Sequence, residues 1–151
     1  MPLEIGAPAP AFTLPGAGGR ETSLAGLAGR KVVLYFYPKD DTSGCTQEAK
    51  EFSELKPEFS AAGAQVIGVS PDSPKSHDKF AGKYGLDLTL LSDEAKETLQ
   101  TYGVWVEKSM YGRKYWGAAR VTFVIGKDGK IAHVFEKVKP AGHDRQVLEW
   151  I

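Results

Sequence analysis

Residues 31–52, KVVLYFYPKDDTSGCTQEAKEF, place a strand pattern, a polar loop and a helix pattern directly after one another. The run KVVLYFY is almost wholly apolar and rich in β-branched and aromatic residues, which is typical of a strand covered on both faces. The run stops at Pro38, and from Cys45 onward small or apolar residues recur at helical spacing, at Ala49, Phe52, Leu55 and Phe59. The only cysteine of the chain therefore falls where a loop leads from a buried strand into a helix.

Strand and helix patterns go on alternating through the rest of the chain. The expected elements are strands at 64–71 and 88–93, helices at 73–85, 93–103 and 141–151, and a β-hairpin over 120–138. Ser73 and Pro74 mark the start of one helix, Ser92 or Asp93 caps the next, and Pro57 ends or kinks the helix that begins near Cys45. This order predicts an α/β fold with a mixed central β-sheet flanked by helices, in which the last hairpin adds an antiparallel edge.

Two segments have no clear period. Residues 1–30 are rich in Gly, Pro and Ala, which predicts an irregular lead-in with a short edge hairpin. Residues 104–119 are aromatic and basic, and they are long for a connection, which is often a sign of function. With no internal repeat, low-complexity tract or linker, the chain is expected to form a single domain over residues 1–151.

Composition and charge exclude several classes of function. The 19 basic and 19 acidic residues cancel, which gives no electrostatic reason to bind nucleic acid or an anionic membrane. No apolar stretch is long enough to span a bilayer, and the N-terminus lacks the pattern of a signal peptide. One cysteine excludes an intramolecular disulfide and fits a reducing, cytoplasmic location.

The histidines and the cysteine show no spacing typical of a metal site, so we expect neither a metal nor another cofactor. The three histidines are expected to be surface or capping residues, at His77, His133 and His143.

The position of Cys45 favours a reactive thiol. A helix N-terminus offers free backbone N–H groups and a positive potential, and both favour thiolate over thiol. An ordinary cysteine has a pKa of about 8.5, and lowering a thiol pKa by about two units requires roughly 2.7 kcal/mol. A helix terminus supplies at most about 2 kcal/mol. We therefore expect a nearby cation and hydroxyl donors to supply the rest.

The loop before Cys45 contains candidates for these roles. Thr42 lies three residues earlier, and its hydroxyl can turn towards the sulfur or, alternatively, cap the helix. Gly44 allows close approach of the backbone, and Pro38 fixes the chain where the strand ends. The competing interpretation is that Cys45 is an inert core residue, since free cysteine is commonly buried.

The pattern of Pro38, Thr42 and Cys45 resembles the active-site segment of peroxiredoxins, and most closely that of the Q-type group, also called bacterioferritin comigratory proteins. The similarity continues over roughly residues 3–138, through the segments IGAPAPAFTLPGAGG, VIGVSPDSPKSHDKFAGKYGL, LLSD and YGRKYWGAARVTFVIGKDGKI. The resemblance implies a thioredoxin-like fold. It also supplies the missing cation, because Arg120 in AARVTFVIG matches the active-site arginine of that family.

The resemblance further implies the chemistry. Cys45 would attack a hydroperoxide, either hydrogen peroxide or an organic hydroperoxide, and become a sulfenic acid. Arg120, the Thr42 hydroxyl and the backbone N–H groups of Gly44 and Cys45 would bind the peroxide and stabilise the leaving oxygen. Pro38 would shield the sulfur from bulk water.

The sequence departs from many Q-type members in one respect. Their second, resolving cysteine lies five residues after the first, where this chain has Lys50, or in the next helix, where residues 73–84 contain none. A sulfenic acid at Cys45 would then need an external thiol, from thioredoxin, glutaredoxin or a low-molecular-weight thiol. A Cys45–Cys45 disulfide between two chains is the weakest alternative. The chain is expected to be a monomer or a weak homodimer.

Other residues near the site receive smaller expectations. Lys39, Asp40 and Asp41 are interpreted as solvated structural residues of the loop. Val121 stands where the family commonly has a small hydroxyl residue, and Trp116 is bulky, so both are candidates for setting substrate preference.

Two other functional classes remain open: a peroxide-sensing module that relays oxidation to a partner, and a scaffold with an inert cysteine. Dithiol–disulfide exchange is disfavoured because Thr42 occupies the first position of a CxxC motif.

Overall fold

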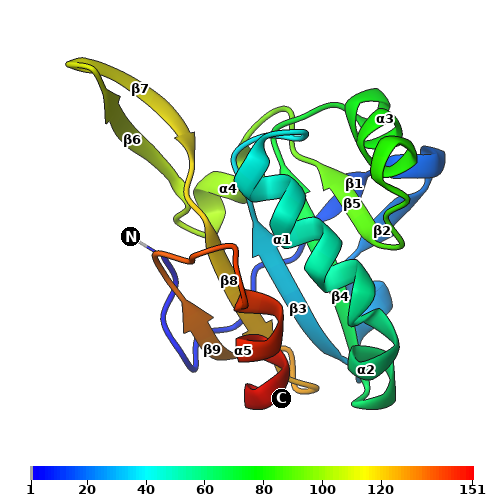
Figure 1. Cartoon of the computed structure of the whole chain (residues 1–151). Coiled ribbons are helices and arrows are strands. Elements are labelled where there is room, and N and C mark those ends of the chain that lie inside the picture. The colour runs from blue at the N-terminus through cyan, green and yellow to red at the C-terminus, as the bar shows by residue number, and fades with distance from the viewer. Residues whose placement is uncertain (1) are drawn as a thin grey trace.

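A five-stranded sheet forms the centre of the protein, whose computed structural model describes residues 2–151 (Figure 1). Its strands, in spatial order, are β5 (Thr89–Ser92), β4 (Ala64–Ser70), β3 (Lys31–Phe36), β8 (Val121–Ile125) and β9 (Ile131–Phe135). β3, β4 and β5 run parallel, while β8 pairs antiparallel with both β3 and β9. The prediction of a mixed sheet with an antiparallel hairpin at one edge is confirmed.

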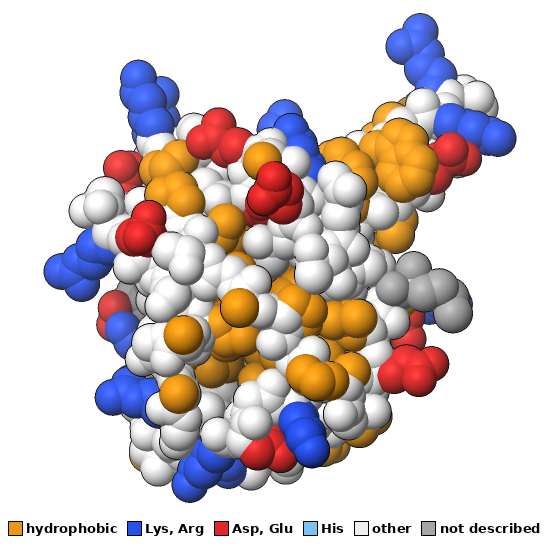
Figure 2. All heavy atoms as spheres, turned by 180° about the vertical axis from the view of Figure 1, so that it is seen from behind, with side chains coloured by type: hydrophobic (Ala, Val, Ile, Leu, Met, Phe, Trp, Pro, Cys, Tyr) orange, Lys and Arg blue, Asp and Glu red, His pale blue; other side chains and the backbone are white. Residues whose placement is uncertain are grey.

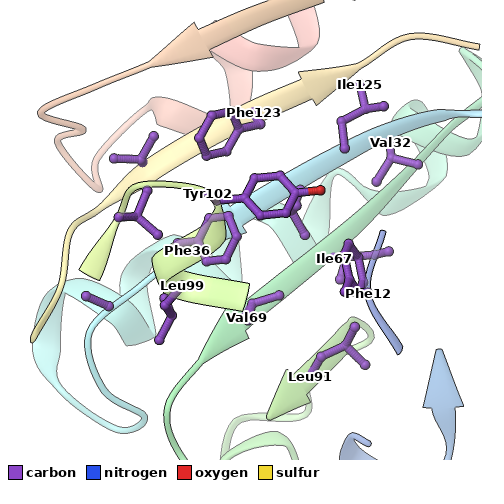
Figure 3. Close-up of a cluster of buried hydrophobic side chains, with 14 of the residues drawn as sticks. Phe12, Val32, Phe36, Ile67, Val69, Leu91, Leu99, Tyr102, Phe123 and Ile125 are labelled. Carbon is purple, nitrogen blue, oxygen red and sulfur yellow. The ribbon is translucent and has the colours of Figure 1, made fainter. Parts of the chain in front are cut away.

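The two faces of the sheet are covered by different elements. One face packs against α1 (Ser43–Glu54), α2 (Lys56–Ala61), α3 (Pro74–Tyr84) and α5 (His143–Trp150). The other packs against α4 (Glu97–Thr101) and the N-terminal segment, where Leu99, Tyr102 and Phe123 form part of a buried cluster (Figure 3). Alternate residues of β3 point into each layer, so this central strand is buried on both faces, as its apolar sequence predicts.

The helix boundaries follow most of the local signals. α1 begins at Ser43, two residues before the expected start, and Pro57 stands in the first turn of α2, where the helical path breaks. The side chain of Ser73 accepts a hydrogen bond from the Ser76 amide at 3.1 Å and caps α3. The predicted helix over 93–103 is too long, because its first residues form a turn. From that turn the Asp93 carboxylate accepts a hydrogen bond from the Leu99 amide at 2.7 Å.

The segment 104–119 forms a β-hairpin of β6 (Trp105–Met110) and β7 (Arg113–Ala118), which projects from the body (Figure 1). Tyr111 and Gly112 both have positive φ at its tip, the backbone that a tight hairpin turn needs. Exposed apolar side chains gather on this projection, at Met110, Tyr111, Tyr115 and Trp116 (Figure 2). The absence of a simple period in the sequence reflects a hairpin that has no buried face over most of its length.

The N-terminal residues form the expected short hairpin and two single turns. These are β1 (Thr13–Pro15), η1 (Ala17–Gly19), β2 (Glu21–Ser23) and η2 (Ala25–Leu27). Among residues 2–151, no helix combines the length and the apolar character needed to cross a membrane.

The expectation of surface or capping histidines is wrong for His77 and His143, which are both almost fully buried. Each can be buried because both of its ring nitrogens have polar partners. His143 contacts Thr122 and Gln146 through its two nitrogens, at 2.8 and 3.1 Å. His77 contacts Asp40 and a backbone carbonyl.

The layer under α1 depends on stacked aromatic rings. Phe52 is fully buried and stacks on Tyr35 of β3, with 4.8 Å between ring centroids. We predict that Phe52→Ala lowers the free energy of unfolding by about 3–5 kcal/mol in urea titration, because it leaves a cavity between α1 and the sheet. Lys50→Ala, on the exposed side of the same helix, should change it by less than about 0.5 kcal/mol. Equal effects of the two substitutions would contradict this packing.

Candidate active site

Cys45 lies in the first turn of α1, with only 1% of the residue exposed. The first helical hydrogen bond here joins the Thr46 amide to the Thr42 carbonyl at 2.8 Å. The amides of Ser43, Gly44 and Cys45 therefore lie at the free N-terminal end of the helix, where no carbonyl of a preceding turn receives them. Their N–H groups give the surroundings of the sulfur a positive potential, as expected from the sequence.

The guanidinium of Arg120 contacts Cys45, with 3.3 Å between Nη2 and Sγ. The register of the sheet explains how two residues so distant in sequence meet. Phe36, the last residue of β3, pairs with Val121, the first residue of β8. Arg120 therefore stands at the end of β3 from which the loop leads into α1.

A buried carboxylate, Glu48, holds the other side of this guanidinium. It lies one turn after Cys45 on the same face of α1, and its Oε1 accepts a hydrogen bond from Arg120 Nη1 at 2.7 Å. Only 1% of the Glu48 side chain and 18% of the Arg120 side chain are exposed. Arg120 therefore bridges the sulfur and the carboxylate in a setting with little water.

Burial decides the protonation of this pair. It raises the pKa of Glu48 from 4.5 to about 7, although the Arg120 guanidinium acts in the opposite direction. Burial also lowers the pKa of Arg120, but the charges of Glu48 and Cys45 outweigh that effect and raise it. Arg120 is thus a permanent cation, whereas the charge of Glu48 changes near neutral pH.

Gly44 and Pro140 define the space beside the guanidinium. A Cβ atom at Gly44 would lie 3.2 Å from Arg120 Nη2 and 3.3 Å from Pro140 Cγ, which is a tight contact on both sides. The glycine therefore lets Arg120 approach the first turn of α1. This agrees with the close backbone approach expected at that position.

Thr42 occupies the N-cap position of α1, but its side chain makes no capping hydrogen bond, so the capping alternative is wrong. Its hydroxyl donates instead to the Lys39 carbonyl at 2.9 Å. No hydrogen bond joins this hydroxyl to the Cys45 sulfur within the part of the chain that the structure describes. Pro38 is half-buried just after the strand, at the start of the same loop.

One expectation for the loop is wrong, while the roles of Val121 and Trp116 in substrate preference stay predictions. Asp40 is buried rather than solvated, because Tyr37 and His77 satisfy its carboxylate. Val121 is buried in the core cluster on the α4 side of the sheet. Trp116 is 58% exposed and lies on the projecting hairpin.

Sequence reasoning missed three residues around the site: Glu48, Pro140 and Lys108. Only Glu48 carried a usable signal, since a carboxylate three residues after a helical cysteine shares its face. Lys108 lies on β6 and donates to the Ala118 carbonyl. Burial lowers the pKa of Lys108, the charge of Arg120 lowers it further, and the charge of Cys45 raises it. This ammonium therefore lies within electrostatic reach of the site. Among residues 2–151, no group of three acidic, histidine or cysteine side chains is placed to hold a metal ion.

Comparison with known proteins identifies the family. Residues 5–134 match the model of the AhpC/TSA family. The chain is 49% identical over 148 residues to a putative peroxiredoxin bcp of Coxiella burnetii, covering 98% of each chain. It is 43% identical over 150 residues to peroxiredoxin Bcp of Escherichia coli K12, covering 99% of this chain and 96% of that relative.

Solved structures agree with these relatives. The bacterioferritin comigratory protein of Xanthomonas campestris superposes with a TM-score of 0.87 at 43% identity, covering 92% of this chain and 88% of the other. A PrxQ mutant from Xylella fastidiosa gives a TM-score of 0.93 at 37% identity, with coverages of 98% and 94%. The chain therefore belongs to the AhpC/TSA family, within its peroxiredoxins, and is a thiol-dependent peroxidase with a thioredoxin-like fold.

The raised pKa of Glu48 predicts a pH-dependent contribution to stability. The folded protein holds this proton more tightly than the unfolded chain, so the stabilising effect is complete below pH 4.5 and is lost as pH rises to about 7. Glu48→Gln keeps an oxygen for Arg120 but does not titrate.

We predict that stability of the Gln variant, relative to the natural protein, rises by about 1–3 kcal/mol between pH 4.5 and pH 8. Urea titrations at several pH values measure this difference. Parallel pH–stability curves for the two proteins would show that Glu48 titrates alike in the folded and unfolded states.

Proposed function

We propose that this peroxidase reduces hydrogen peroxide and organic hydroperoxides through a sulfenic acid at Cys45, which an external thiol then reduces. The observation that carries the proposal is the 3.3 Å contact between Arg120 and Cys45, the only cysteine in the chain. A guanidinium at that distance favours the thiolate, which is the nucleophilic form of cysteine.

In the first step the thiolate attacks the terminal oxygen of the hydroperoxide. An S–O bond forms as the O–O bond breaks, so the sulfur is oxidised and the peroxide is reduced. The terminal oxygen keeps its hydrogen and becomes the sulfenic acid hydroxyl. The other oxygen leaves with the electron pair and takes a proton, giving water from hydrogen peroxide or an alcohol from an organic hydroperoxide.

Several residues are proposed to support this step. Arg120 and the backbone N–H groups of Gly44 and Cys45 donate to the peroxide oxygens where negative charge develops. The Thr42 hydroxyl donates its hydrogen to the Lys39 carbonyl, but its oxygen has lone pairs that can still accept a hydrogen bond. Thr42 therefore acts as an acceptor for the O–H of the substrate, while Pro38 shields the sulfur from bulk water.

The substrate range is supported by a relative. The structures of the Xanthomonas campestris protein concern its alkyl peroxide reduction activity. At 43% identity and a TM-score of 0.87, a comparable site in this chain supports organic hydroperoxides as substrates beside hydrogen peroxide.

The return to the thiol needs other molecules. One thiol attacks the sulfenic acid, releasing water and forming a mixed disulfide with Cys45. A second thiol attacks this disulfide and frees the Cys45 thiol. Thioredoxin, glutaredoxin or a low-molecular-weight thiol would serve, because Lys50 occupies the position of the resolving cysteine of many relatives and no second cysteine exists.

The test is the rate at which reduced protein reacts with hydrogen peroxide, followed by tryptophan fluorescence in a stopped-flow instrument. We expect a rate orders of magnitude above that of an unactivated thiol, and no reaction in Cys45→Ser. Cumene hydroperoxide tests the organic class in the same way. A rate like that of free cysteine, or a reaction that survives Cys45→Ser, would overturn the proposed mechanism.

A further inference from the structure

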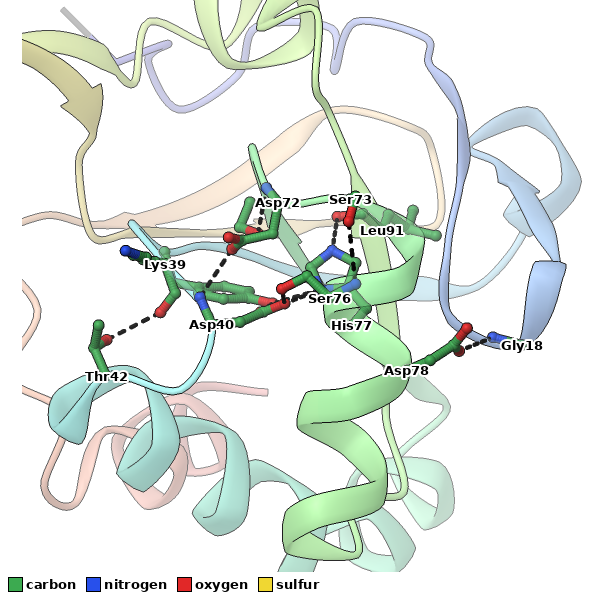
Figure 4. Close-up of polar contacts among 12 residues, drawn as sticks. Gly18, Lys39, Asp40, Thr42, Asp72, Ser73, Ser76, His77, Asp78 and Leu91 are labelled. Atoms are coloured by element: carbon green, nitrogen blue, oxygen red, sulfur yellow. Dashed lines mark hydrogen bonds and ion pairs between the residues drawn. The ribbon is translucent and has the colours of Figure 1, made fainter.

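A buried polar network ties the loop before Cys45 to α3 (Figure 4). The Asp40 carboxylate accepts hydrogen bonds from the Tyr37 hydroxyl at 2.7 Å and from the Ser76 hydroxyl at 2.8 Å. The same carboxylate lies 2.7 Å from Nδ1 of His77, and the Asp40 amide donates to Asp72 at 2.8 Å. One loop residue thus joins the end of β3 to α3 and to the segment before it.

The second nitrogen of His77 fixes the proton arrangement. Nε2 lies 2.9 Å from the Leu91 carbonyl, which only accepts, so Nε2 carries a hydrogen. Nδ1 lies 2.7 Å from the Asp40 carboxylate and 3.4 Å from the Tyr37 hydroxyl. His77 therefore links the loop to β5 through polar contacts at both ring nitrogens.

Burial makes this link stronger than the other contacts of the loop. The side chains of His77 and Asp40 are only 0% and 4% exposed. Asp41 also contacts α3, through Lys83 and Tyr84, but Asp41 and Lys83 are exposed and solvent screens their ion pair. Asp41 itself holds a φ of 58°, in the left-handed region that Asp adopts more readily than most other non-glycine residues.

The peroxidase chemistry uses none of these polar groups directly. Asp40 lies only five residues before Cys45, and the N-cap of α1 lies between them. The Cys45 sulfur is buried, so the first turn of α1 must open before a bulky thiol reaches an oxidised sulfur there.

We propose that the Asp40–His77 pair is a positioning device for Cys45. It holds the loop against α3 and β5, keeps the first turn of α1 folded with the sulfur beside Arg120, and sets how often that turn opens to an external thiol. The last part rests on the function proposed above, whereas the positioning of the turn does not.

Two substitutions separate the two halves of the link. His77→Gln places a donor near the former Nε2 and keeps the contact to Leu91 but loses Asp40. His77→Asn places a donor near the former Nδ1, so it keeps the contact to Asp40 but loses the contact to Leu91.

Asp40→Asn is a milder third variant, for use if His77→Gln does not fold. Asp78→Asn is the matched control, because Asp78 is the next residue of α3 and, among residues 2–151, its carboxylate binds only the Gly18 amide, at 2.6 Å (Figure 4).

Hydrogen–deuterium exchange on the full reduced protein tests the positioning. In His77→Gln we expect amide exchange over residues 43–49 to rise by about tenfold or more, while β3 and β8 exchange as in the natural protein. The exchange of residues 43–49 in His77→Asn should lie between that of His77→Gln and that of the natural protein. Asp78→Asn should leave the exchange of these residues unchanged. Unchanged exchange over 43–49 in both His77→Gln and Asp40→Asn, or an equal rise in Asp78→Asn, would overturn the proposal.

Kinetics test the second part. In His77→Gln the reaction with hydrogen peroxide should slow by about ten- to a hundredfold, because the sulfur is less well placed. The reaction of the oxidised protein with glutathione should become several-fold faster, because the turn opens more often. Unchanged exchange in β3 and β8 separates this effect from a general loss of stability. A change of both rates in the same direction would overturn this part. An unreactive natural protein would instead refute the proposed function, while the exchange data would still decide the positioning.

Discussion

The contact between Arg120 and Cys45 is the interaction on which the proposed chemistry of this protein depends, and the sheet register creates it. β3 and β8 pair so that Phe36 faces Val121. Tyr37, which follows Phe36, begins the loop to α1, and Arg120, which precedes Val121, carries the guanidinium. The antiparallel β8 thus brings a cation to the edge where the parallel strands β3, β4 and β5 end. Sites in α/β sheets commonly form at that edge.

The site joins a cation and two potential anions in a nearly dry space. Arg120 contacts both Sγ of Cys45 and Oε1 of Glu48, so it is shared between them. When Glu48 is protonated, below its pKa of about 7, the charge of Arg120 acts mainly on the sulfur; when Glu48 is ionised, it competes. The burial that strengthens each charge interaction also makes an unpaired polar group costly.

The sequence predicted the parts of the fold that follow local rules. The apolar run of β3, the Ser73 cap and the Pro57 break are each local signals, and the structure agrees with them. Residues 104–119 show no hydrophobic period typical of strands, because most side chains of this hairpin face solvent on both sides. The contact between Arg120 and Cys45 was predicted from the family resemblance, since no local rule predicts a contact between the start of β8 and α1. Glu48 was missed although its spacing from Cys45 is a local signal, whereas Pro140 and the buried roles of Asp40 and His77 depend on tertiary packing.

The central claim is that Arg120 activates Cys45 and the peroxide through a directed pair of donors, and Arg120→Lys tests it most directly. Lysine keeps the positive charge but cannot bridge Cys45 and Glu48 with the planar fork of a guanidinium. The rate constant for hydrogen peroxide should fall by about a hundredfold or more, whereas Arg113→Lys on the projecting hairpin should leave it unchanged. An unchanged rate in Arg120→Lys would contradict this claim, because positive charge alone would then suffice.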